Sequence, residues 1–124
     1  MGSLVRSVSR MIACASLVAA LATGAHAHAI VIDSEPADGG GGPPPHRLRL
    51  HFNSRIERTL CSVVLVGPGS GPARLLHQQT ATAPDTLAYA LPPLSPGTYQ
   101  ARWKVMSSDG HLTEGTVSFS VRAP

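Results

Sequence analysis

Short runs in which apolar and polar residues alternate are the dominant pattern of the chain. Residues 48–52 place two leucines and a phenylalanine on one face, and residues 117–121 repeat this pattern with serines on the second face. Residues 97–106 carry aromatic and aliphatic side chains at every second position, among them Trp103. A period of two is typical of a β-strand with one buried face. We therefore predict strands whose apolar faces, Trp103 included, point into one core.

Clusters of proline and glycine separate these runs, and no segment after residue 27 shows a long helical period. Residues 37–45, 67–72 and 92–97 are expected to be turns or loops, the first of them long. The sequence thus predicts an all-β fold, a small Greek-key β-sandwich or barrel of about seven strands. The predicted strands are residues 28–32, 47–52, 60–66, 73–76, 86–91, 97–106 and 113–121.

Residues 1–27 have the pattern of a secretory signal peptide. Arg6 and Arg10 precede residues 11–22, which are apolar and free of charge. This stretch is too short to cross a bilayer, for which about 20 apolar residues are needed. The pattern predicts export to the periplasm or the cell exterior, with no membrane span after cleavage.

The end of this segment, Ala-His-Ala at residues 25–27, offers small residues at both positions that a signal peptidase reads. We predict cleavage after Ala27, which leaves residues 28–124 as a single domain that begins with His28. Cleavage after Ala25 is the alternative, and it would leave a histidine at position 26 as the first residue.

Charge and cysteine content narrow the possible functions. The formal charge of +3 includes both signal arginines, so the exported domain is nearly neutral, and it has no basic stripe of the kind that binds nucleic acid. Cys61 is the only cysteine after residue 27, so no intramolecular disulfide can form. It lies in the apolar run 60–66, where we predict a buried thiol within a strand. We expect a monomer.

Three residues predict a metal site. Cleavage after Ala27 gives His28 a free amine, and this amine and the imidazole Nδ1 can close a chelate ring on one ion. Asp109 and His111 are two residues apart, so on an extended segment they would face the same side. Together these groups offer three nitrogens and one oxygen, a set that suits tetragonal Cu(II) and binds it above Zn(II). We predict one Cu(II) ion per chain, held by His28, Asp109 and His111, and no catalytic residues.

Simpler interpretations of the same residues remain open. Asp109 and Gly110 form a strong hairpin-turn signal without any metal, and His111 alone fits an ordinary exposed histidine. The remaining histidines of the exported domain are weaker candidates. His46 is expected in a loop, His51 on the outer face of its strand and His77 at a strand end.

Several motifs taken together identify a family resemblance. They are His28-Ala29 and the segments 34–39 (SEPADG), 48–52 (LRLHF), 96–99 (PGTY), 103–105 (WKV), 107–111 (SSDGH) and 115–119 (GTVSF). With these motifs the chain resembles the CopC-type copper-resistance proteins over almost all of the part after residue 27. No single motif would be specific, but the set is.

The resemblance implies an immunoglobulin-like Greek-key β-barrel or sandwich. It also implies a Cu(II) site built from the mature N-terminal histidine and the D-x-H pair, which here are His28, Asp109 and His111. Members resemble exported copper carriers that work with a membrane partner of the CopD type, which moves copper inward. The resemblance therefore implies an exported copper-binding protein of copper homeostasis or resistance.

Two departures from the family pattern stand out. Many members hold Cu(I) in a methionine-rich loop, but Met106 is the only methionine after residue 27 and residues 67–82 contain none. Because soft Cu(I) prefers thioether sulfur, we predict no methionine-based Cu(I) site. Some relatives place an acidic residue just after the His-Phe strand, near the terminal histidine, where Asn53 and Ser54 stand here.

Three functions are compared. The leading prediction is copper binding and delivery without catalysis. The second is a copper-dependent oxidative enzyme that uses a terminal-histidine brace, although Asp109 would fill a position that oxygen needs and the chain has no aromatic binding platform. The third is a metal-free sandwich module for protein interactions.

Overall fold

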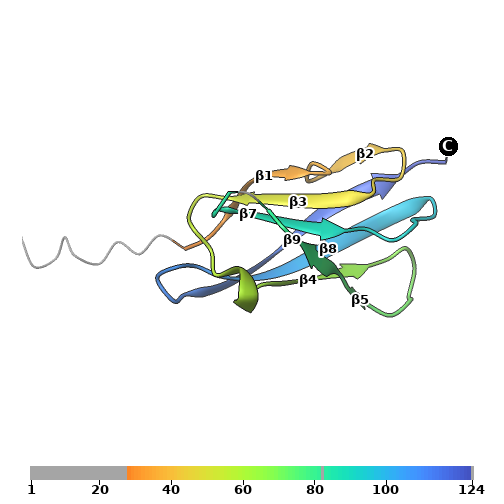
Figure 1. Ribbon diagram of the computed structural model, residues 1–124. Coiled ribbons are helices and arrows are strands. Elements are labelled where there is room, and N and C mark those ends of the chain that lie inside the picture. The colour runs from red at the N-terminus through yellow and green to blue at the C-terminus, as the bar shows by residue number, and fades with distance from the viewer. Residues whose placement is uncertain (1–27, 82, 124) are drawn as a thin grey trace, which may run out of the picture.

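A computed structural model describes residues 28–81 and 83–123, which form two packed β-sheets (Figure 1). The elements are β1 (Val31–Glu35), β2 (Gly40–Gly42), β3 (Arg47–Phe52), the 3-10 helix η2 (Arg58–Leu60), β4 (Ser62–Val66), β5 (Arg74–Leu75), β6 (His77–Gln79), β7 (Thr86–Ala90), β8 (Gly97–Met106) and β9 (Leu112–Val121). Within this part of the chain, no helix has the length and apolar character that crossing a membrane requires.

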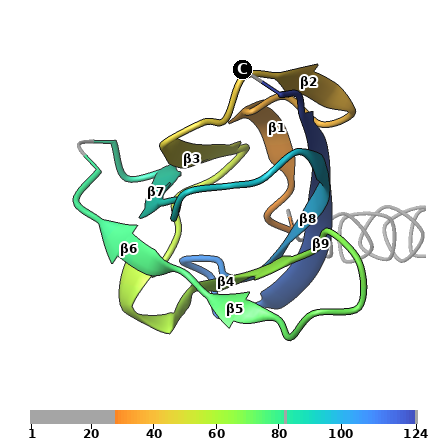
Figure 2. The same ribbon diagram turned by 90° about the vertical axis from the view of Figure 1, so that its right-hand side faces the viewer.

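The two sheets have strand orders β1-β3-β7-β6 and β2-β9-β8-β4-β5. Figure 2 shows the two layers end on. After the short excursion to β2, the chain passes between the sheets from β3 to β4, from β5 to β6 and from β7 to β8, as Greek-key connections do. The last two strands form a long antiparallel hairpin, paired from Gly97 with Val121 to Met106 with Leu112. The predicted small all-β sandwich is confirmed.

The apolar faces predicted from the alternation form the core between the sheets. Phe52 from β3 packs edge to face against Trp103 from β8, with ring centroids 5.4 Å apart and an interplanar angle of 83°. Tyr99 stacks on Phe119 across the β8–β9 pair, with centroids 5.6 Å apart. The prediction that Trp103 anchors the core is confirmed, because its side chain belongs to the buried cluster.

A glycine makes room for the indole of Trp103. Gly115 lies opposite Trp103 in the β8–β9 pairing, and a Cβ atom built on Gly115 would come within 2.2 Å of Cζ2 and 2.5 Å of Cε2 of that ring. Real Cβ atoms do not approach ring carbons so closely, because the core is packed to crystal-like density. The absence of a side chain at position 115 therefore lets the indole approach the backbone of β9 closely.

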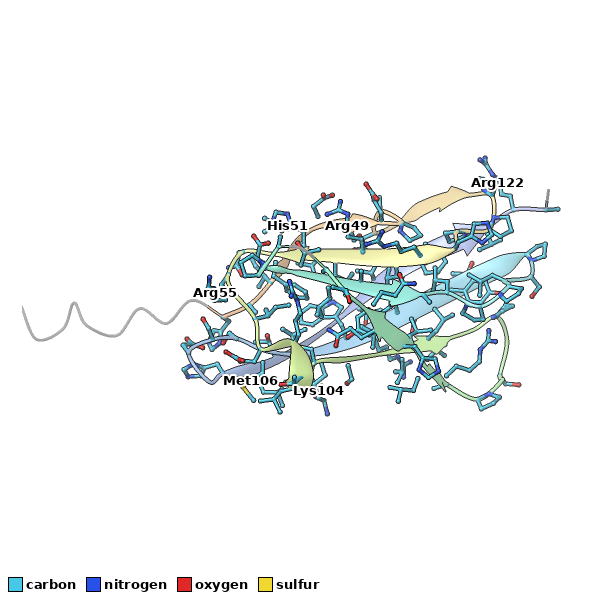
Figure 3. The ribbon with its side chains drawn as sticks, in the orientation of Figure 1. Arg49, His51, Arg55, Lys104, Met106 and Arg122 are labelled. Carbon is cyan, nitrogen blue, oxygen red and sulfur yellow. The ribbon has the colours of Figure 1, made fainter. Side chains whose placement is uncertain are left out.

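The outer faces carry the polar residues of the alternating runs. Figure 3 shows Arg49 and His51 on the outer side of the sheet that contains β3, and Lys104 and Met106 on the opposite side of the molecule. His51 was predicted on an outer face, and its half-buried side chain contacts Asp85, with Nε2 and Oδ2 3.0 Å apart.

Two predicted strands differ from the structure. Cys61 is not inside a strand: it follows η2, is half-buried, and its thiol donates a hydrogen bond to the carbonyl oxygen of Glu57 at 3.1 Å. Burial raises the pKa of this thiol, so it stays protonated at neutral pH. His77 was expected to end a strand, but it begins β6, because the chain changes sheets at buried Leu76.

The N-terminal part also differs from the prediction. The first strand begins at Val31 rather than at residue 28, and the residues before it bond to both sheets through the side chains of Asn53 and Thr113. The loop expected at residues 37–45 contains β2, which pairs in parallel with the end of β9. Asp38 starts this pairing, since its carboxylate accepts a hydrogen bond from the Ser118 N–H at 2.8 Å.

Candidate metal centre

The β8–β9 hairpin closes in a tight turn at residues 107–111. Gly110 has a φ of +89°, a conformation that favours glycine, and its N–H donates to the Ser107 carbonyl oxygen at 3.0 Å. The hydroxyl of Ser107, a residue only 2% exposed, contacts Asp109 Oδ1 and lies 3.0 Å from the His111 carbonyl oxygen. Ser107 therefore holds the turn from inside the fold.

Asp109 and His111 are in contact across this turn. Asp109 Oδ2 lies 3.1 Å from His111 Nδ1, and Oδ1 accepts a hydrogen bond from the His111 backbone N–H at 3.2 Å. The two residues were predicted to face the same side of an extended segment, and that reason is wrong, because they lie on a turn. They still converge, since the turn folds both side chains toward one another.

Hydrogen bonds keep the carboxylate of Asp109 ionised. The hydroxyl of Ser107 is the largest cause, followed by the His111 backbone N–H, and together they lower the pKa of Asp109 from 3.8 to about 2. Asp109 therefore carries a negative charge throughout the neutral and mildly acidic range. A cation at this turn would meet a permanent anionic oxygen.

Replacing Asp109 with asparagine should change how the stability of the metal-free protein depends on pH. Because the folded pKa of Asp109 is lower than its unfolded value, ionised Asp109 stabilises the fold above pH ~4, and this contribution is lost as pH falls toward about 2. We expect the free energies of unfolding of the wild type and Asp109→Asn to differ most near neutral pH and to converge between pH ~4 and ~2. Urea titrations at several pH values test this.

The difference in the free energy of unfolding between the two proteins separates the contribution of Asp109 from those of the other acidic residues. Hydrogen bonds from Arg49 and His51 also lower the pKa values of Asp33 and Asp85, respectively, but these groups are present in both proteins. A difference that stays constant from pH ~7 to ~2 would contradict the assignment.

Residues 28–30 connect the two sheets next to this turn. Ala29 is fully buried, and its carbonyl oxygen accepts a hydrogen bond from the Thr113 hydroxyl in β9 at 3.0 Å. On the other side, Asn53 follows β3; the Ile30 N–H donates to Asn53 Oδ1 at 2.9 Å and Asn53 Nδ2 donates to the His28 carbonyl oxygen at 3.1 Å. These contacts place the start of the described chain beside the hairpin turn.

The ring of His28 meets the ring of His111. Their centroids are 5.4 Å apart and the rings are nearly perpendicular, at 86°. Two imidazoles bound to one ion through bonds of about 2.0 Å have centroids about 4.4 to 6.3 Å apart, from adjacent to opposite corners of a square. The observed separation lies within this range.

The contact between Asp109 and His111 also fits a shared ion. Two donors on adjacent corners of a square, each about 2.0 Å from the ion, lie about 2.8 Å apart. The Oδ2–Nδ1 distance is 3.1 Å, so a small movement would bring both atoms onto one ion.

The side chains do not form a complete metal site by themselves. Within residues 28–81 and 83–123, no three His, Cys, Asp or Glu side chains are grouped closely enough to hold an ion. The missing donor of the predicted set is the amine of His28, which is a peptide nitrogen until the bond to Ala27 is cut. That bond and the segment before it lie outside the described residues. The ligand set of His28, Asp109 and His111 stays a prediction.

The structure places the other candidate residues elsewhere. His51 is engaged with Asp85 on the outer face of its sheet, as described above. His46 lies before β3, at the end remote from Asn53, and His77 is exposed on β6. The structure thus brings together the three residues predicted from the sequence and separates them from His46 and His77.

Two supporting residues were not assigned a role by the sequence analysis. Thr113 had only been placed in a strand, and Ser107 only within a motif. Asn53 had been noted only as a departure from the family pattern, and its bonds to the distant backbone of residues 28 and 30 carry no local sequence signal. β1 pairs with β3, and the N-terminal segment reaches β9 through the carbonyl oxygen of Ala29.

Comparison with known proteins identifies the fold and the family. Residues 31–122 match the CopC domain, which is most of the chain. The chain belongs to the CopC family. Copper resistance protein C of Pseudomonas syringae pv. tomato is 31% identical over 119 residues, which cover 90% of this chain and 92% of that relative. The recognised resemblance is confirmed.

Solved CopC structures share the architecture. CopC from Methylosinus trichosporium OB3b superposes with a TM-score of 0.66 at 26% identity and covers 76% of this chain and 93% of its own. PcoC from Escherichia coli, described as a methionine-rich copper resistance protein, has a TM-score of 0.64 at 23% identity, covering 77% of this chain and all of its own, and so shows the fold alone. By contrast, the present CopC-family chain has one methionine after residue 27.

Proposed function

We propose that the exported chain, cleaved after Ala27, binds one Cu(II) ion through four donors. These are the amine and imidazole of His28, the imidazole of His111 and the carboxylate of Asp109. The meeting of the His28 ring with the Asp109–His111 pair is the observation that carries the proposal, because it joins distant parts of the chain at one point. A nitrogen and oxygen set without thiolate favours Cu(II).

The ion is the cargo of this protein. Membership in the CopC family supports a role in copper resistance. We propose that a monomeric carrier holds Cu(II) outside the cytoplasm. The side chains of His111 and Asp109 are 43% and 40% exposed, so a partner can reach the ion. We propose a membrane copper transporter of the CopD type as that partner, in line with the family resemblance.

The donor set supports the function of a copper carrier rather than that of an oxidative enzyme. An oxygen-activating copper brace needs an open equatorial position, and the carboxylate of Asp109, ionised because its pKa is about 2, would fill it. Release of Cu(II) then depends on competition for His28 or on protonation of its amine, whose ordinary pKa is about 8.

The test uses protein exported from cells with its own residues 1–27. Mass analysis of the N-terminus should show His28 as the first residue, and copper titration should give one tightly bound Cu(II) per chain with a type-2 EPR spectrum. In a matched control the His28 amine is selectively acetylated, which removes that donor, and this protein should bind Cu(II) far more weakly. Equal binding by the control, or only millimolar affinity of the wild type, would overturn the proposal.

A further inference from the structure

Hydrogen bonds from the fold occupy the backbone of residues 28–30. Asn53 Nδ2 donates to the His28 carbonyl oxygen at 3.1 Å, while the Ile30 N–H donates to Asn53 Oδ1 at 2.9 Å. The backbone N–H of Asn53 donates to the Ile30 carbonyl oxygen at 3.0 Å, and the Thr113 hydroxyl donates to the Ala29 carbonyl oxygen at 3.0 Å. The carbonyl oxygens of residues 28, 29 and 30 and the N–H of Ile30 therefore all take part in hydrogen bonds.

An N-terminal histidine offers Cu(II) two competing chelates. One ring joins the amine to the imidazole Nδ1. The other joins the amine to the first peptide units, through the carbonyl oxygen of residue 28 or, with release of a proton, through the amide nitrogens that follow. Peptide nitrogens are strong in-plane donors to Cu(II). They would occupy the coordination positions that Asp109 and His111 of the hairpin would otherwise fill.

We propose that Asn53 is a positioning residue that selects the amine–imidazole chelate of His28. Asn53 holds the carbonyl oxygen of His28, which one peptide chelate uses directly and which fixes the plane of the peptide that carries the Ala29 nitrogen. It also holds the N–H of Ile30, the next nitrogen along the chain. Cu(II) is then limited to the amine and imidazole of His28, and its remaining in-plane positions stay open for Asp109 and His111. This inference rests on the proposed function, because it concerns the same ion.

The position of Asn53 explains how a chain terminus can be ordered before the ion arrives. Terminal residues usually fray, and ordering them during binding weakens affinity. Here Asn53 extends from the end of β3 in one sheet, Thr113 lies in β9 of the other, and the side chain of Ala29 is buried between them. Thr113 anchors the segment through the carbonyl oxygen of Ala29 and does not contact the carbonyl oxygen of His28 or the N–H of Ile30, which makes it a suitable control.

The test compares Asn53→Leu, Asn53→Asp and Thr113→Val, each exported and cleaved like the wild type and given one equivalent of Cu(II). Leucine removes both side-chain hydrogen bonds, and aspartate keeps only the acceptor for Ile30. Pulsed EPR and circular dichroism of the copper bands distinguish imidazole from peptide-nitrogen ligands. Wild type and Thr113→Val should show two imidazoles, whereas Asn53→Leu should show peptide-nitrogen ligation, loss of the His111 signal and affinity weaker by about 10-fold or more.

A measurement on the metal-free protein reports the local hydrogen bonds of each variant before copper is added. Hydrogen exchange at the Ile30 amide of the metal-free protein should be slow in the wild type and Asn53→Asp but fast in Asn53→Leu. If Asn53→Leu does not fold, Asn53→Asp still decides, because its loss of the donor to the His28 carbonyl oxygen should by itself introduce peptide-type ligation.

The outcomes separate this inference from the proposed function. An unchanged copper spectrum in both Asn53 variants, or the same change in Thr113→Val, would overturn the role of Asn53. If at the same time His111→Ala loses the second imidazole, the proposed function stands. Unchanged binding and spectrum in His111→Ala would overturn the proposed function itself.

Discussion

The variant His111→Ala should lose Cu(II) affinity by about 100-fold or more, since altering even the partners of metal ligands costs about 10- to 100-fold. His111 would provide one nitrogen directly, and it also faces Asp109, with Nδ1 3.1 Å from Oδ2. Its removal therefore takes away one ligand and the neighbour that orients a second. Competition titration against a chelator of known affinity measures the change, and EPR should report one imidazole instead of two.

The matched control is His77→Ala. His77 is exposed on β6, at the edge of the other sheet, so its loss should leave copper affinity within about threefold of the wild type. Circular dichroism of both metal-free variants should match the wild type, because neither side chain belongs to the core. An equal loss of affinity in the two variants would show that binding is non-specific.

Gly115→Ala should destabilise the fold by about 1–3 kcal/mol, as insertion of a methyl group into a packed core typically does. The new Cβ would lie 2.2 Å from Cζ2 of Trp103, and the indole cannot retreat freely because it packs on Phe52 at 5.4 Å. Urea unfolding followed by the fluorescence of Trp103, the only tryptophan of the chain, measures the effect.

Two comparisons make this stability prediction sharp. Gly42→Ala is the control, because a Cβ at position 42 meets nothing within 4 Å among the described residues, and a small gain of up to about 1 kcal/mol is expected there. Trp103→Phe removes the ring atoms that clash. Gly115→Ala should therefore lower the free energy of unfolding much less when Trp103 is already phenylalanine than it does in the wild type. Additive losses in the double variant would contradict the proposed clash.

Much of the sandwich follows from the sequence because strand alternation is a local signal. Residues 47–52 and 97–106 have the predicted bounds, since their apolar residues occupy every second position without interruption. The glycine-rich β2 was missed, because residues without side chains carry no alternation, and its pairing depends on a contact between Asp38 and the distant Ser118.

The candidate site shows the same division between local and distant information. The contact between Asp109 and His111 is local and was expected, although the turn brings it about rather than an extended strand. The approach of His28 depends on contacts made by Ala29 and Asn53 with distant elements, and no periodic pattern encodes them. The family motifs supplied the expectation that the sequence pattern alone left open.

The described C-terminal residues lie at the end of the sandwich remote from the β8–β9 turn, as Figure 1 shows. A fluorescent reporter or a surface anchor joined there would leave unobstructed the end that carries the proposed copper site. The same label joined to the amine of His28 would cap the nitrogen on which the proposed chelation depends. Engineering this protein as a copper sensor therefore requires carboxyl-terminal attachment.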